Sequence, residues 1–253
     1  KVQNQLADDK RTIKEYSACE FNDLSCNNLI ITDLILHNCI FKNINFTGTD
    51  LRNLKAENCV FTDCNFNNAN LEESTFLKCN FFNKEQISGC SFKQSNLKFL
   101  TMMKCNVAFS IFKKANLYGC KIQDCYGRGA SFELADFTMK VSGKFIFSDA
   151  EISDSNFIDS DFNMVNLSGC SLAGSSFENV DFSSSDLSRA DFSYSILVKN
   201  ELVNTNLTGA DLRYADIRNL DITKIDLTGV LINEDQQSGL LEEIGMIVCQ
   251  TKD

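Results

Sequence analysis

Between residues 157 and 232 an apolar residue occupies every fifth position of this chain. The register passes through Phe157, Phe162, Leu167 and Leu172 and continues unbroken to Ile232. Five is neither the period of a helix nor the two-residue period of a plain strand. It does fit three extended residues followed by two corner residues, because residues i−2 and i of an extended segment face the same way.

The positions around these apolar centres are restricted too. Two residues before a centre the side chain is usually small, as at Ser160, Ser175 and Ala190, and one residue before it is often an acid or amide, as at Asp181 and Asn206. Small and large side chains would then both point into a coil, and successive coils would pair about 4.8 Å apart. Because one coil cannot bury its own apolar face, the pattern predicts a solenoid.

The same period covers most of the chain but is interrupted twice. It begins at Phe21, holds to Phe81, slips by one residue, and then runs from Ile87 to Ile232 with Gly127 and Ser142 as the exceptions. We therefore predict loop excursions near residues 82–89 and 138–148. Binding residues concentrate on loops held by a rigid scaffold, although tolerated insertions without a function are the alternative. The candidate partner-binding residues are Asn83, Lys84, Glu85, Gln86, Ile87, Ser88, Met139, Lys140, Val141, Ser142, Gly143 and Lys144.

The two ends of the chain depart from the repeat. Residues 1–18 are polar and are expected to form a cap or a tail, and residues 19–232 form the predicted solenoid. In residues 233–253, a short helix is expected to end at Gly245, followed by a short apolar strand. This segment either covers the last coil or joins two copies of the chain. The candidate dimer interface is Leu240, Leu241, Ile244, Met246, Ile247 and Val248.

Composition narrows the class of protein. The chain has no proline, which suits a backbone paired on both sides, and it has no apolar run long enough to span a membrane. Ten of the twelve cysteines occupy the small i−2 position, no CxxC pair occurs, and His37 is the only histidine. We interpret the cysteines as small buried side chains rather than zinc ligands, and free thiols favour a reducing, cytoplasmic compartment. No catalytic set, metal site or cofactor motif can be assembled, so an enzyme is not expected.

Charge is divided unevenly between the two parts of the chain. Residues 1–148 contain 18 Lys and Arg against 15 Asp and Glu, a net charge of +3, whereas residues 149–253 contain 6 against 19, a net charge of −13. An acidic rod is not expected to bind nucleic acid directly, since that requires cations against phosphates. It is better suited to a protein surface that is itself built to bind DNA.

The repeats in Ala190–Tyr194 and Ala210–Tyr214 resemble those of the pentapeptide-repeat family. The resemblance implies an all-β fold, a right-handed quadrilateral β-helix with four repeats per coil, here with two loop excursions and a short C-terminal helix. Within that family the chain resembles the Qnr-type quinolone-resistance proteins, through the break before Cys90, the break around residues 139–144 and the segment 237–248. The likeness covers roughly residues 50–248, and the earlier repeats are an extension at the N-terminus.

The family likeness also implies a function. Qnr-type proteins form homodimers through the C-terminus, bind DNA gyrase and topoisomerase IV, and protect them from quinolones. With four repeats per coil, Asp161, Asp181, Glu201 and Asp221 fall in one column, where neighbouring carboxylates repel by roughly 0.9 kcal/mol even in water. A repulsion repeated in one column favours a negative, DNA-mimicking surface, although acids that merely keep the rod soluble are the alternative. A generic interaction scaffold or bacterial effector that binds another protein is the competing function.

Overall fold

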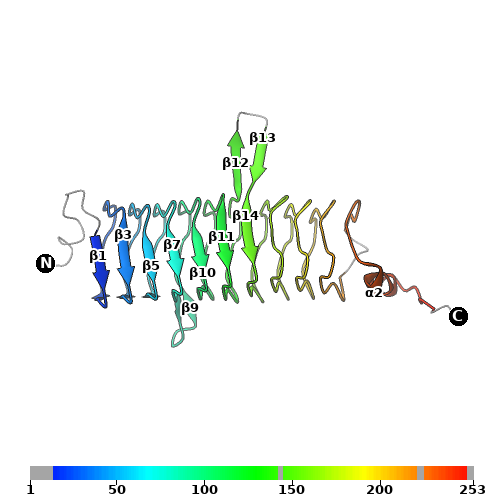
Figure 1. The fold of residues 1–253 in the computed structure, drawn as a ribbon, viewed down its shortest axis with the longest axis horizontal. Helices are drawn as coiled ribbons and strands as arrows, with labels where there is room; N and C mark the ends of the chain where they lie inside the picture. Colours follow the sequence, from blue (N-terminus) through cyan, green and yellow to red (C-terminus); the bar gives the residue numbers. More distant parts are fainter. Residues whose placement is uncertain (1–13, 142–144, 221–224, 250–253) are drawn as a thin grey trace.

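The computed structural model describes residues 14–141, 145–220 and 225–249. The chain forms an elongated rod with its termini at opposite ends, and two hairpins project from opposite sides (Figure 1). Of the predicted site residues, Asp221, Ser142, Gly143 and Lys144 lie outside the described residues.

Parallel pairing stacks the turns of the rod. Strand β1 (Lys14–Ser17) pairs in register with β3 (Leu34–His37), so that Glu15 lies beside Ile35, twenty residues later. One seven-stranded sheet follows the order β1-β3-β5-β7-β10-β11-β14, and a three-stranded sheet follows β2-β4-β6. The remaining members of these sheets are β2 (Glu20–Asn22), β4 (Ile40–Lys42), β5 (Lys55–Glu57), β6 (Val60–Thr62), β7 (Thr75–Leu77), β10 (Thr101–Met103), β11 (Cys120–Gln123) and β14 (Ala150–Ser153).

The ladder continues beyond the last of these strands. Glu151 pairs with Ser171, Ser171 with Asp191, and Asp191 with Asp211, each time at a spacing of twenty residues. Four repeats of five residues therefore make one turn of the rod throughout the described chain.

A single repeat shows why five residues form one side of the turn. Val165 and Leu167 are buried, two positions apart on an extended segment, and Gly169 then adopts a φ of +70°. The N–H of Cys170 donates to the carbonyl of Leu167 at 3.0 Å and closes the corner. The left-handed corner recurs at position i+2 and is often occupied by Asn, Asp or Gly, the residues that tolerate this conformation best.

The acid or amide at position i−1 has a local structural role. Its side-chain oxygen accepts the backbone N–H two residues later, as from Ser183 to Asp181 at 2.7 Å and from Thr208 to Asn206 at 3.1 Å. This turn bond is what Asp and Asn side chains make best. It explains why the sequence prefers these two residue types beside each centre.

The inward positions form one continuous apolar core. Phenylalanine rings from successive turns stack face to face, with centroids 4.9 Å apart for Phe41 and Phe61 and 4.7 Å apart for Phe112 and Phe132. Such rings contribute large buried areas together with favourable ring geometry. The predicted fold class, a quadrilateral β-helix with two excursions and a short C-terminal helix, is confirmed.

All twelve cysteines are free thiols, and ten of them are buried. Burial raises the pKa of the Cys170 thiol to about 11. A thiol with so high a pKa is almost entirely protonated at neutral pH and is a poor nucleophile.

The structure departs from the predicted register in several places. Paired backbone begins at Lys14, inside the segment expected to be a cap or tail. Ile87 and Phe147, which the five-residue period places among the inward centres, are 65% and 53% exposed because both lie on the projecting hairpins.

In the described part of the C-terminal segment, up to residue 249, the chain is helical and contains no strand. A short 3-10 helix η2 (Glu234–Gln236) leads into α2 (Gln237–Glu243), with Asn233 and Gln236 forming a capping box. Residues 246–249 have no regular secondary structure, so the expected apolar strand is wrong for the single chain. Within the described residues no strand of the same chain lies beside them to pair with.

Candidate partner-binding surfaces

The first excursion is a short hairpin of β8 (Phe82–Asn83) and β9 (Ser88–Gly89). Asn83 is buried and serves the hairpin itself: its amide donates to Asp63 at 2.8 Å, and its oxygen accepts the N–H of Glu85 at 2.9 Å. Ser88 also donates to Asp63, at 3.3 Å. The exposed tip is therefore residues 84–87, ending in an apolar Ile87 whose φ is +52°.

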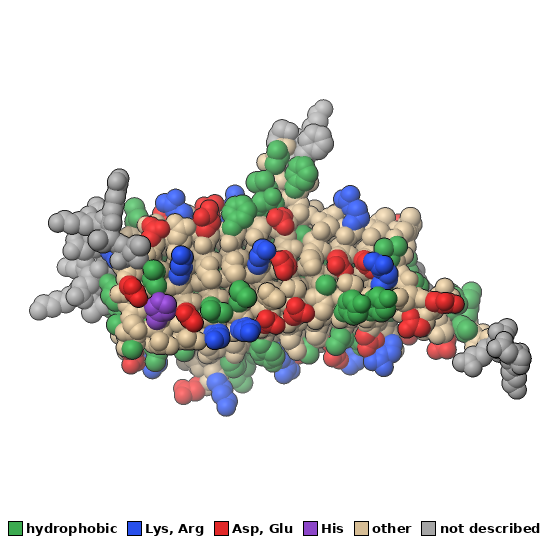
Figure 2. All heavy atoms as spheres, viewed as in Figure 1, with side chains coloured by type: hydrophobic (Ala, Val, Ile, Leu, Met, Phe, Trp, Pro, Cys, Tyr) green, Lys and Arg blue, Asp and Glu red, His purple; other side chains and the backbone are tan. Residues whose placement is uncertain are grey.

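The second excursion is a longer hairpin of β12 (Thr138–Val141) and β13 (Phe145–Ser148), which stands out from the rod. Figure 2 shows hydrophobic side chains along it. Val141 is 45% exposed, and the facing strand adds Ile146 at 59% and Phe147 at 53%. Ile146 and Phe147 were not among the predicted site residues. The consecutive apolar residues 145–147 were the available signal, since the rod turns only positions i−2 and i inward and would leave the middle residue of such a run outward.

Both hairpins are insertions that leave the ladder in register. The pairing Asn65–Ser91 spans 26 residues and the pairing Tyr126–Asn156 spans 30, whereas turns on either side span 20. The insertions are thus six and ten residues long. The rigid β-helix resumes after each one, which holds both hairpins at fixed places on its surface.

The predicted acidic column is assembled as expected for its described members. Asp161 pairs with Asp181, and Asp181 pairs with Glu201, on three successive turns. Asp161 and Asp181 are half-buried, and one carboxylate oxygen of each accepts the backbone N–H two residues later. Glu201 is exposed. None of the three forms an ion pair with any described Lys or Arg.

A neighbouring column of the same half is built differently. Asn166, Asp186, Asn206 and Asp226 alternate amide and acid along the rod. The amide of Asn206 donates to Asp186 at 3.0 Å, so that the amides separate and bind the carboxylates. The chain therefore uses two solutions at the same backbone position: a column that disperses negative charge and a column that concentrates it.

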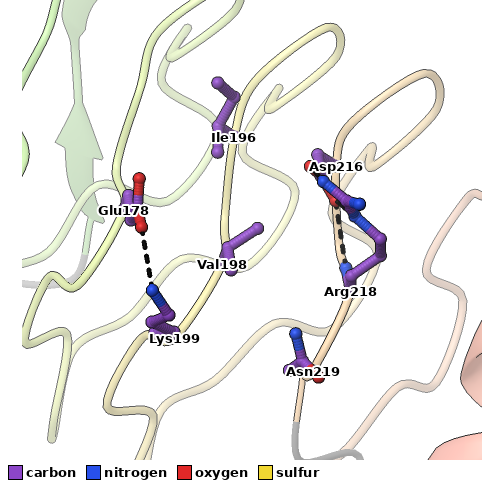
Figure 3. A pocket seen from close by; sticks show the side chains of 7 residues that line it. All are labelled: Glu178, Ile196, Val198, Lys199, Asp216, Arg218 and Asn219. Atoms are coloured by element: carbon purple, nitrogen blue, oxygen red, sulfur yellow. Dashed lines mark hydrogen bonds and ion pairs between the residues drawn. The ribbon is translucent and has the colours of Figure 1, made fainter.

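A shallow groove of about 420 Å³ crosses another face of the acidic half (Figure 3). Ile196 and Val198 lie between two ion pairs, Glu178–Lys199 at 3.2 Å and Asp216–Arg218 at 2.6 Å. Hydrogen bonds from Arg218 lower the pKa of Asp216, so this carboxyl is an anion at neutral pH and no proton donor. Sequence reasoning missed the groove, which arises because Ile196 replaces the usual acid or amide. With its charges internally paired, the groove offers apolar contact and no evident chemistry.

The predicted dimer-interface residues do not share one environment. Leu240 and Leu241 are half-buried, and Leu240 packs against the core of its own chain. Ile244, Met246, Ile247 and Val248 are exposed, with Ile247 at 89%. The outward apolar surface of this segment is therefore formed by the four later residues.

The described residues contain neither a cluster suited to a metal ion nor a helix suited to a membrane. No group of three or more His, Cys, Asp or Glu side chains there is arranged to hold a metal ion. Among those same residues, no helix has the length and apolar character needed to cross a bilayer.

The geometry defines a class of protein, and comparison with known proteins agrees with it. The pentapeptide-repeat family model matches in eight copies over residues 36–67, 160–197 and 200–229. The matched segments are pentapeptide repeats, and the rod around them has the same four-sided, twenty-residue turn.

Its structure resembles that of one solved member in particular. Full-length QnrB1, described as a plasmid-mediated fluoroquinolone resistance protein, superposes with a TM-score of 0.76 at 26% identity, covering 92% of this chain and all of QnrB1. A trypsin-treated M102R form of QnrB1 gives a TM-score of 0.73 at 25% identity, covering 94% of this chain and all of that one. No curated protein matches the sequence.

Proposed function

We propose that this protein is a non-enzymatic DNA mimic that binds DNA gyrase, with topoisomerase IV as a second target, and protects it from quinolones. The proposal starts from the likeness to QnrB1, a fluoroquinolone resistance protein, over nearly the whole of both chains. Its twelve free cysteines suit a reducing compartment, and we place it in the cytoplasm, where bacterial topoisomerases act.

The observation that carries the proposal is the column Asp161–Asp181–Glu201, whose acids form no ion pair with the described Lys or Arg, although Asp161 and Asp181 accept hydrogen bonds from Ser131 and Asn163. Its carboxylates recur once per turn, about 4.8 Å apart, and each DNA strand carries a phosphate every 3.4 Å or so. Asn could make the same turn bond without the charge, as it does at Asn206. The acids are therefore not required by the backbone, which favours a role for the negative surface itself.

The exposed hairpin residues supply the non-electrostatic part of the proposed contact. Lys84, Glu85, Gln86 and Ile87 form the tip of the first hairpin. On the second hairpin Lys140, Val141, Ile146 and Phe147 are exposed and Met139 is half-buried. Exposed apolar side chains on a projecting element are typical of protein-binding surfaces. We assign the second hairpin the larger share because more of its apolar surface is accessible.

The test is a gyrase supercoiling assay with ciprofloxacin, titrated with the purified protein. We expect supercoiling to recover at near-equimolar protein. Deleting residues 138–147 restores a twenty-residue turn, so the rod should still fold while protection falls; deleting residues 83–88 does the same for the first hairpin. A protein that neither rescues nor inhibits gyrase or topoisomerase IV would refute the proposal.

A second candidate function is an interaction scaffold for a different protein. The exposed Ile146 and Phe147 favour it equally, since an apolar hairpin does not specify its partner. The acidic column distinguishes the two functions. If Asp181→Asn and Glu201→Gln leave gyrase protection intact while the hairpin deletion abolishes it, DNA mimicry is excluded as the mechanism.

We also propose that two copies join through the C-terminal segment. Ile244, Met246, Ile247 and Val248 expose an apolar surface beyond the last turn, and a two-fold dimer is the commonest way to cover one. Ile244→Asp or Ile247→Asp should shift the protein to monomer in sedimentation equilibrium. Val203→Asp, at an exposed apolar site elsewhere on the rod, is the control. A dimer that persists in both segment variants contradicts this assignment.

A further inference from the structure

Many corners of the rod carry an acid that is bound from the next turn. The carboxylates of Asp23, Asp33, Asp63 and Asp159 each accept a hydrogen bond from an asparagine twenty residues later, at 2.7 to 2.9 Å. The donors are Asn43, Asn53, Asn83 and Asn179. The arrangement gives each of these four corner carboxylates an N–H donor from within the chain.

Asp154 is a corner acid that lacks this donor. It has the same left-handed backbone, with φ of 51°, and one turn later the corner residue is Gly174, which has no side chain. The backbone bond from Asp154 N to Ala173 O, at 3.2 Å, shows that the two turns are adjacent. Among the described residues, its carboxylate has neither an ion pair nor a side-chain hydrogen bond. A Cβ at Gly174 would lie 2.6 Å from Oδ1 of Asp154, so the carboxylate leans over the vacant position.

An exposed aromatic ring lies on the other side of the same vacancy. The next corner residues are Tyr194 and Tyr214, whose rings stack with centroids 4.7 Å apart and planes 9° apart. Tyr214 belongs to the later turn and covers one face of Tyr194. The turn of Gly174 precedes that of Tyr194, since the N–H of Gly174 donates to Ser193 O at 2.9 Å, and Tyr194 remains 65% exposed.

The corner thus presents an open carboxylate and an exposed tyrosine ring that come from residues two turns apart, with Gly174 on the turn between them, in a half of net charge −13. We propose that Asp154, Gly174 and Tyr194 form a binding site for the guanidinium group of an arginine side chain on a protein partner. The planar guanidinium stacks on Tyr194 and donates to Asp154, in the place that an asparagine amide fills at the other corners. Arginine is favoured over lysine because its flat, forked group can stack and donate at once.

The site does not rest on the proposed action on gyrase, since a small arginine derivative can test it. The chain has five tyrosines and no tryptophan, so 3-fluorotyrosine labelling gives five ¹⁹F resonances, and Tyr194→Phe identifies that of Tyr194. On titration with Nα-acetylarginine methylamide, the Tyr194 resonance should shift saturably. The lysine analogue should bind about threefold or more weakly, and sodium chloride at equal ionic strength should give no saturable shift. A Tyr194 resonance that does not move, or moves equally with all three, overturns the site.

Gly174→Asn is the decisive variant, because it recreates the Asp–Asn bond of the other corners and fills the vacancy. Asparagine tolerates the left-handed corner, and the crowding is with the free end of a flexible side chain. The arginine-dependent shift should disappear. Gly169→Asn is the matched control, at another left-handed corner with open space around it, and should keep the shift. Asp154→Asn alters no backbone and should weaken arginine binding severalfold; unchanged binding in both Gly174→Asn and Asp154→Asn refutes the proposal.

Discussion

The two halves of the rod have one kind of interior but different corners. In the first half, Asp23, Asp33 and Asp63 are each bound by an asparagine of the next turn. In the second half one such pair is present, Asp159 with Asn179, and other corners carry a stacked tyrosine pair and an acid facing a glycine. Inward positions are fixed by packing, which leaves little choice of side chain. Outward side chains only have to be compatible with the turn. The side-chain differences between the two halves therefore occur at outward positions.

If the interior is equivalent in both halves, removing a buried ring should lower the free energy of unfolding by the same amount in each. Phe61→Ala and Phe182→Ala both remove a ring that is at most 1% exposed, and each should lower the free energy of unfolding by about 3–5 kcal/mol. Phe147→Ala is the matched control, because the five-residue period assigns it to the same inward register although it is exposed. Urea denaturation compares them. A cost below about 1 kcal/mol for Phe182→Ala, or an equal cost for Phe147→Ala, would contradict the observed packing.

Gly127 is the inward centre without a side chain, and the next turn fills its space. A Cβ there would collide with the ring of Phe157. Gly127→Ala should therefore destabilise the rod by about 1–3 kcal/mol through overpacking. Gly239→Ala in α2, where a Cβ meets nothing within 4 Å, should be neutral or slightly stabilising. Equal thermal shifts for the two variants would show that Phe157 adjusts without strain.

Substitutions in the acidic column distinguish the hydrogen bond that an acid makes in the turn from the effect of its charge on the surface. Asp181→Ala loses the bond from Ser183 N and should cost about 0.5–1.5 kcal/mol. Asp181→Asn keeps an acceptor in the same place and removes a repelled charge, so its stability should equal or slightly exceed that of the parent. Chemical denaturation at low salt measures both. An asparagine variant as unstable as the alanine variant would mean that the charge itself is structural.

The smallest expected effect comes from the paired acids of the second half. Hydrogen bonds from Arg213 lower the pKa of Asp211, so the folded state favours the carboxylate. This contribution is present above the unfolded pKa of about 4 and is lost as pH falls through the lower folded value. Arg213→Gln should therefore be marginally less stable at pH 7 and indistinguishable near pH 2. Because Arg213 is half exposed, solvent screens the pair, and a large difference at pH 7 would be unexpected.

The rod could be predicted because the sequence pattern that forms it repeats every five residues. An inward Phe or Leu every fifth residue allows one backbone register, and the predicted column Asp161–Asp181–Glu201 followed from counting twenty residues per turn. The period failed where an insertion happened to carry an apolar residue in phase, as at Ile87 and Phe147. A pattern of side-chain types cannot tell an inward residue from an outward one when the chain leaves the rod and pairs with itself.

The parts of the candidate surfaces that were missed depend on neighbours far along the chain. Asn83 was expected to face a partner, yet its amide is taken by Asp63 of the preceding turn. The open corner at Asp154 is visible only when residues 154, 174 and 194 are seen as one ladder. The three residue types can be read from the sequence, but only the structure shows that Asp154 has no side-chain donor on the next turn.

The register of the ladder across both hairpins has a practical consequence for engineering. Six extra residues at one corner and ten at another leave the pairing of the following turns intact. A foreign peptide placed between the strands of the β12–β13 hairpin should therefore be displayed at a set height on an unchanged support. Adding or removing whole twenty-residue turns between the two hairpins would change their separation in steps of about 4.8 Å. The fold could then serve as a molecular ruler for placing two recognition elements at a chosen distance.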